Sequence, residues 1–333
     1  MTPAAIRMPA KFLRGARTAP ALRAVAPYAL AVIVFLVGGQ VINGFTDLVN
    51  VRSLLVIAAL LGIVSAGQSL TILLAGIDLS IPALMAFSNV LSVELYGKGW
   101  SFGVVIAALL VGAALIGATS GFVSKKLNAH PLIITLAVSS MVTGGVLTYT
   151  QGGESTQALP AWISEAVSPA GHTAGVAIPA VVVVWAAIAA LVVFLQRGTV
   201  FGRHLYATGA NPSAAPYALV RTTWIWVVCF ALSAVFAAVG GILLGGLSGG
   251  ASVDAGAPYL FLTVAAVVVG GTPLLGGRGG YGPTIGGVLL ITVLTTLLVG
   301  VGVDQQEQQM LLGGLIVAVV AIYGRQASVR TQI

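Results

Sequence analysis

The sequence predicts an all-α membrane protein that crosses the bilayer about ten times, and three observations lead to this prediction. Hydrophobic residues make up 58% of the 333 residues and charged residues 7%, with a mean hydropathy of +1.05. Soluble globular domains do not have this composition. Apolar runs close to the ~20 residues needed to cross the hydrocarbon core recur along the chain. Basic residues gather in alternate connecting segments, as in other proteins that cross the membrane repeatedly.

The chain is expected to start with a basic tail, residues 1–24, followed by an uncleaved first membrane helix. A signal peptide is the alternative, but the apolar run is long for one and no clean small-x-small cleavage site follows it. Residues 25–324 then form one membrane domain, and residues 325–333 form a second tail. The predicted spans are 25–44, 53–75, 81–97, 101–123, 130–151, 175–196, 222–247, 258–275, 282–302 and 308–324.

The distribution of charge predicts which side of the membrane each end occupies. An even number of spans places both termini on one side, and all but two of the 15 Lys and Arg residues fall on that side, the exceptions being Arg52 and Lys98. Cytoplasmic loops carry this excess of basic residues, so both ends are expected in the cytoplasm. Every acid except Asp78 falls near or beyond the outer surface. The net charge of +7 is explained by orientation and does not call for nucleic acid.

Glycine accounts for 43 of the 333 residues, which is typical of closely packed membrane helices with small residues at their contacts. Pairs of glycines four residues apart point to such contacts: Gly117 and Gly121, Gly241 and Gly245, and Gly282 and Gly286. The only cysteine, Cys229, lies in an apolar run, which excludes an intrachain disulfide or a cysteine-based metal site. We expect Cys229 to be a small core residue.

A long basic connection, residues 197–221, separates two apolar runs and contains no acid. We expect Gly209 to end one segment, Asn211 to cap the next and Pro212 to occupy its first turn. The small residues that follow would give a short surface helix with a smooth face. Such a helix suits docking into a groove of another protein. A plain connector between membrane helices would look the same, and the residues alone leave both interpretations open.

The segment Gly202-Arg203-His204-Leu205-Tyr206-Ala207-x-Gly209-x-Asn211-x-x-Ala214-Ala215 resembles the coupling segment of the membrane subunits of ATP-binding-cassette importers for ribose, xylose, arabinose and related sugars. This resemblance favours docking over a connector. It implies that an ATPase subunit contacts the segment through Gly202, Arg203, Tyr206, Gly209, Asn211, Ala214 and Ala215. The chain departs from the family at Ala210, Pro216 and Leu219, where Gly, a basic residue and Gly are usual.

Gly76-Ile77-Asp78-Leu79-Ser80 is similar to the signature segment of the same family. Gly76 is expected to end a helix and Ser80 to cap the next, with Pro82 tolerated in its first turn. Asp78 is the one acid placed in the membrane or on its inner side. Its carboxylate can line a hydrated pathway. It can also cap a tight turn, which is the more common role.

Other polar residues within the spans are candidates for lining a pathway: Gln68, Ser69, Thr135 and Thr143. Thr135 belongs to Ile134-Thr135-Leu136, which again resembles the family. Hydroxyl groups in membrane helices more commonly bond to neighbouring backbone groups, so that alternative stays open.

Residues 264–290, VAAVVVGGTPLLGGRGGYGPTIGGVLL, resemble the family's glycine-rich hairpin between two late spans. The sequence predicts a tight inner turn at Gly277, Arg278 and Gly279. A phosphate-binding loop is excluded, because no Walker lysine follows and no strand precedes the glycines. Leu260 and Leu262 stand where the family commonly has acids.

The resemblance implies a type II ABC importer-like permease fold in a bacterial inner membrane. The implied partners are ATPase subunits, a second permease copy or a close paralogue, and a periplasmic or lipid-anchored solute-binding protein. ATP and Mg would be bound by the ATPase, so this chain would need no cofactor or metal of its own and would not be an enzyme. The implied solute is a pentose, a hexose or a similar small polar molecule, with a nucleoside as an alternative.

Two other functional classes are consistent with the composition. An ion-coupled secondary transporter usually buries several ionisable residues near the midplane, whereas this chain offers only Asp78. A channel or a non-transporting scaffold would need no docking segment. Both classes are therefore disfavoured.

Overall fold

The computed structural model describes residues 10–151, 157–173 and 175–324, and this part of the chain folds into helices joined by turns. The predicted C-terminal tail and the first nine residues of the N-terminal tail lie outside it. The α-helices are α1 (Ala10–Val41), α2 (Leu48–Leu73), α3 (Ile81–Gly97), α4 (Phe102–Lys126), α5 (Pro131–Thr150), α6 (Ala161–Val167), α7 (Ala180–Gly198), α8 (Val200–Ala210), α9 (Thr222–Ser248), α10 (Tyr259–Val269), α11 (Tyr281–Gly300) and α12 (Gln305–Gly324).

Each predicted span overlaps one of these helices. Six helices of the described part, α2, α4, α5, α7, α9 and α11, are long and apolar enough to cross a membrane. Shorter apolar helices are 25–41 within α1, α3 and α10. Within the predicted span 258–275, the helix α10 has only 11 residues, Tyr259–Val269. That length rises ~16 Å, about half of the ~30 Å hydrocarbon core.

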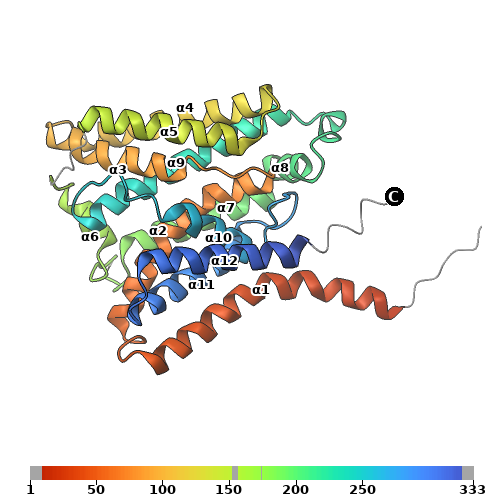
Figure 1. Ribbon diagram of the computed structural model, residues 1–333, viewed down its shortest axis with the longest axis horizontal. Helices are drawn as coiled ribbons and strands as arrows, with labels where there is room; N and C mark the ends of the chain where they lie inside the picture. The colour runs from red at the N-terminus through yellow and green to blue at the C-terminus, as the bar shows by residue number, and fades with distance from the viewer. Residues whose placement is uncertain (1–9, 152–156, 174, 325–333) are drawn as a thin grey trace, which may run out of the picture.

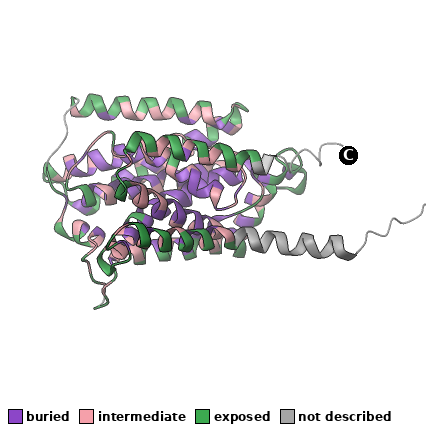
Figure 2. Cartoon of the chain, turned by 60° about the horizontal axis from the view of Figure 1, so that its bottom comes forward, coloured by how far each residue is buried: buried purple, intermediate pink, exposed green. Residues whose placement is uncertain are grey.

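The core is built around α2 and α9. α2 is surrounded by protein, since its residues from Ala58 to Leu73 are buried without a break, the polar Gln68 and Ser69 among them. α1 and α12 cover one side of the molecule, and α4 and α5 cover the other (Figure 1). Buried residues concentrate between these layers, while the outer helices carry the exposed ones (Figure 2).

Close contacts between helices depend on the glycines that the sequence singled out. A Cβ on Gly121 would lie 2.6 Å from the Trp226 carbonyl oxygen, so α4 and α9 touch through their backbones. A Cβ on Gly241 would lie closer still to the Met85 carbonyl oxygen of α3. Cys229 is fully buried in α9, as predicted for a small core residue.

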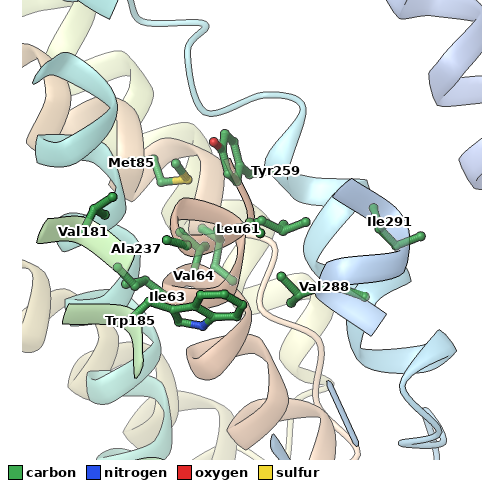
Figure 3. Packing of buried hydrophobic residues seen from close by; sticks show 14 of the residues in the cluster. Leu61, Ile63, Val64, Met85, Val181, Trp185, Ala237, Tyr259, Val288 and Ile291 are labelled. Atoms are coloured by element: carbon green, nitrogen blue, oxygen red, sulfur yellow. The ribbon is translucent and has the colours of Figure 1, made fainter. Parts of the chain in front are cut away.

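Trp185 of α7 packs beside Ile63 and Val64 of α2 in the largest apolar cluster (Figure 3). Its indole N–H donates to the Tyr281 hydroxyl at 2.9 Å, and that hydroxyl donates to the Gly62 carbonyl at 2.6 Å. The relay joins α7, α11 and α2 in the interior. Trp185 is therefore a packing residue of the core.

Candidate coupling site and helix break

α8 and the turn after it protrude at the end of the molecule where α1 begins and α12 ends (Figure 1). The Thr199 side chain caps α8 by accepting from the Gly202 amide at 3.2 Å. Asn211 follows the helix, and its side-chain oxygen accepts from the amides of Ser213 and Ala214 at 3.2 and 2.9 Å. A 3₁₀ turn, η1 (Ala215–Ala218), completes the loop.

The local prediction for this loop was right about the cap and wrong about the helix. Asn211 caps the segment after it as expected, but that segment forms only a turn and η1. α8 precedes Asn211 and ends at Ala210, one residue after the predicted stop at Gly209. The surface helix that the sequence predicted after Asn211 is replaced by the short turn η1.

Three of the seven predicted coupling residues face the interior of this chain. Gly202, Gly209 and Ala215 are buried. A Cβ on Gly209 would lie 3.0 Å from the Gly277 nitrogen and closer still to the Leu73 carbonyl oxygen. These residues let α8 touch its own bundle, so a bulky substitution at Gly209 would disturb this chain and not only an ATPase contact.

The outward face of the loop carries the other predicted residues and two that sequence reasoning missed. Arg203, Asn211 and Ala214 are exposed. Tyr217 and Leu219 are 92% and 90% exposed, which is unusual for large apolar side chains. Leu219 also has a φ of 59°, a conformation that suits glycine. Two bulky apolar residues in a basic loop were the available signal, and Leu219 already stood out as a departure from the family pattern.

Tyr206, the seventh predicted coupling residue, ties α8 to the hairpin between α10 and α11. Its hydroxyl donates to the Gly279 carbonyl at 2.9 Å. Burial raises the pKa of Tyr206, an effect that the nearby charge of Arg197 partly offsets. The hydroxyl therefore keeps its proton at neutral pH and remains a donor.

Hydrogen bonds from backbone amides fix the hairpin of residues 270–280 in place. The Gly277 amide donates to the Leu73 carbonyl at 2.9 Å, and the Gly280 amide to the Thr272 side chain at 3.1 Å. Gly277 and Gly279 both have positive φ, which explains the glycines at the predicted tight turn. Arg278 between them is exposed. The turn thus joins α8 on one side and the end of α2 on the other.

α2 ends in a helix stop that differs from the predicted one. The Gly76 amide donates to the Thr71 carbonyl at 3.0 Å and the Ala75 amide to the Ile72 carbonyl at 2.9 Å, which is the Schellman pattern. Ala75, with a φ of 60°, takes the left-handed position that the sequence assigned to glycine. Ser80 precedes α3 but makes no side-chain cap to it. Its hydroxyl turns back to Asp78 instead.

The Asp78 carboxylate is 1% exposed and fully engaged by this chain. One oxygen accepts from the Ser80 amide and hydroxyl at 3.0 and 2.5 Å, and the other accepts from the Ser233 hydroxyl of α9 at 2.7 Å. Three hydrogen-bond donors of this chain satisfy the buried carboxylate in its place in the interior. This arrangement favours the turn cap over a pathway-lining acid, and it adds a tie to α9 that the sequence did not reveal.

The four polar candidates do not converge on an open pathway. Gln68, Ser69 and Thr135 have no exposed surface. The Ser69 hydroxyl donates to the Ala66 carbonyl, and Thr135 links the Leu79 amide to the start of α5 at 3.1 Å, so both bond to backbone. Neither amide atom of Gln68 has a partner within the described residues. Thr143 is half-buried on α5.

These features define a class: a multi-pass helical membrane protein with a protruding loop fixed to a buried helix break. The chain belongs to the family described as "Branched-chain amino acid transport system / permease component", whose model matches residues 50–320. It is therefore a transport component and not an enzyme.

Similar proteins cover most of the chain. The ribose import permease protein RbsC of Bacillus subtilis is 31% identical over 284 residues, which is 85% of this chain and 87% of that protein. The fructose import permease protein FrcC of Rhizobium meliloti is 32% identical over 88% of this chain and 82% of its own length. The D-allose transport system permease protein AlsC of Escherichia coli is 29% identical over 89% of each. No solved structure matches.

Proposed function

We propose that this chain is the membrane subunit of an ATP-binding-cassette importer that takes up a pentose or hexose sugar. Three similar proteins named for ribose, fructose and allose import support the sugar class. The observation that carries the proposal is the exposed tip at Tyr217 and Leu219, at the end of a loop otherwise fixed to the bundle. The bacterial inner membrane is the corresponding location.

Motion of the loop has a direct route into the bundle. α8 lies against the Leu73 carbonyl through Gly209, and that carbonyl accepts from Gly277 of the hairpin. Tyr206 joins the same hairpin by its hydroxyl. An ATPase that displaces the tip therefore moves the helix break and the hairpin together, which can switch access to a pathway. ATP and Mg would be held by the ATPase, so this chain supplies mechanical contacts only.

We further propose ten crossings, with residues 25–324 as one membrane domain, residues 197–221 as its cytoplasmic coupling loop and both termini in the cytoplasm. The start of α1, the end of α12 and α8 lie at one end of the molecule, which supports this topology (Figure 1). α10 then crosses together with the non-helical residues after it. A second permease copy, an external binding protein and lipid would cover the remaining surfaces.

The test is Ala214→Trp, at an exposed position of the coupling loop. We expect the variant to insert and fold normally but to lose ATP-driven uptake and bind the ATPase at least tenfold more weakly, because added volume separates the two surfaces. Uptake is measured in vesicles containing the ATPase and the binding protein. Trp at exposed Val111, in the middle of α4, is the control. Normal uptake in Ala214→Trp would contradict the docking surface.

The same vesicles separate the functional classes. Accumulation without the ATPase would favour an ion-coupled transporter, while downhill flux without it would favour a channel. Thermal-shift measurements on the binding protein with pentoses, hexoses, polyols and nucleosides identify the solute. A nucleoside would contradict the sugar class alone.

A further inference from the structure

A cavity of about 390 Å³ lies between α2, α10, α11 and α12, close to the end of α11 and the start of α12. Its apolar wall includes Ile57 and Leu262. The polar lining consists of five neutral side chains: Thr295, Thr296, Gln305, Gln308 and Gln309. Cavities of this volume are in the range that holds small ligands, which typically meet apolar walls with a few polar groups.

The polar groups of the cavity retain free bonding capacity. Gln308 uses its amide nitrogen on the Val303 carbonyl at 2.9 Å, which leaves its side-chain oxygen available. Thr295 donates to the Ile291 carbonyl at 2.9 Å and can still accept. Within the described residues, the structure shows no hydrogen bond made by the side chains of Gln305 or Gln309. An amide offers two donors and an acceptor, the set that matches hydroxyl groups.

The position of Gln309 distinguishes the cavity from an ordinary water-facing helix end. Gln309 lies more than one turn inside α12 and is half-buried, in a wall that also contains Leu312. Polar side chains within membrane helices rarely face lipid, and they commonly mark a substrate pathway. The acids of the same region, Asp304 and Glu307, are exposed and do not line the cavity.

We propose that this cavity binds a neutral polyhydroxylated solute, and that Gln305 and Gln309 form hydrogen bonds to its hydroxyl groups. The inference rests on the proposed import function and adds the place and chemistry of recognition. Neutral amides and hydroxyls suit an uncharged solute, because a charged one would be desolvated there without a counter-charge. The apolar wall suits the C–H faces of a sugar ring.

The test compares Gln309→Leu and Gln305→Leu with the matched control Gln306→Leu. Gln306 is exposed on the same helix but does not line the cavity. ATP-driven uptake of D-ribose, D-fructose and D-allose is measured in vesicles containing the ATPase and the binding protein, together with ATP hydrolysis. We expect each cavity variant to reduce uptake about tenfold, equivalent to ~1.4 kcal/mol. The control should remain within about twofold of the native chain.

Selectivity separates recognition from a merely structural role. If Gln309 forms a hydrogen bond to a hydroxyl group of the solute, Gln309→Leu should reduce the preference for the transported sugar over its deoxy analogues. Gln309→Asn should restore part of that preference. A structural effect would lower uptake of both sugars in proportion. Native uptake by all cavity variants, or an equal loss in the Gln306 control, would overturn the inference. Failure of the unmodified chain to import any of the three sugars with ATP would instead contradict the proposed function.

Discussion

Glycines at the α8 junction and glycines on α5 and α12 have opposite surroundings. At the junction, a Cβ on Gly209 or Gly277 would run into backbone atoms of the neighbouring segment. On the outer helices, a Cβ on Gly144 or Gly313 would find no other atom of the described chain within 4 Å. The same residue type thus marks a completed contact in one region and a bare surface in the other.

This difference shows what each region is ready to contact. The junction is closed, so α8, the hairpin and the end of α2 can only move together. The faces of α5 and α12 are open, and small residues there permit close approach of another helix. Bare glycine faces on two helices agree with a second permease copy as the proposed partner, and the following predictions test the contrast.

The largest effect is expected for Gly209→Val. Its side chain would overlap the Leu73 carbonyl, and backbone atoms cannot move aside as flexible side chains can. We expect destabilisation by ~3 kcal/mol or more and little folded protein. Ala207→Val on the exposed face of the same helix is the control. Thermal unfolding in detergent provides the measurement, and a native-like Gly209→Val would show that the junction is looser than described.

An intermediate effect is expected for Asp78→Ala. The change leaves the Ser233 hydroxyl and the Ser80 amide buried without their acceptor, which costs ~1 to 3 kcal/mol. Ser233→Ala should cost less, since it removes one of three donors, and the double variant should cost less than the sum of the two single changes. If Asp78→Ala abolished uptake at unchanged stability, the carboxylate would belong to the pathway and not to the turn.

The smallest effect is expected for Gly313→Ala. No atom of the described chain opposes the new methyl group, and alanine favours a helix over glycine, so unfolding of the isolated subunit should change by no more than ~1 kcal/mol and toward stability. Unfolding of monomeric protein in detergent tests this. A clear loss of stability would mean that the α12 face is already covered within one chain.

Local structure was predictable from the sequence where it depends on residues that are neighbours along the chain. The Asn211 cap and the apolar helices fall into this group, since each follows from a few consecutive positions. The end of α10 was missed because the predicted span ran on to the apolar Leu274 and Leu275, whereas the helix ends at Val269, before Gly270 and Gly271, and Gly271 has a φ of 94°. An apolar run does not reveal a break made by backbone conformation.

Long-range pairing was not predictable. Gly209 was assigned to a partner protein, because nothing near it in the sequence indicates Leu73 or Gly277. Ser233 lies in an unbroken apolar span and gave no sign of meeting Asp78. Nothing near Gln305 and Gln309 in the sequence indicates a cavity, and only the packing of α10 and α11 against α12 shows it.

The buried helix break also has a consequence for biosynthesis. Asp78 meets Ser233 across 155 residues, and the Gly62 carbonyl meets Tyr281 across 219. The ribosome delivers α2 and α3 long before these partners exist. Unpaired backbone groups and an unpaired carboxylate are costly in lipid. The nascent chain therefore has to stay at the translocon, away from lipid, until α9 and the hairpin have been synthesised.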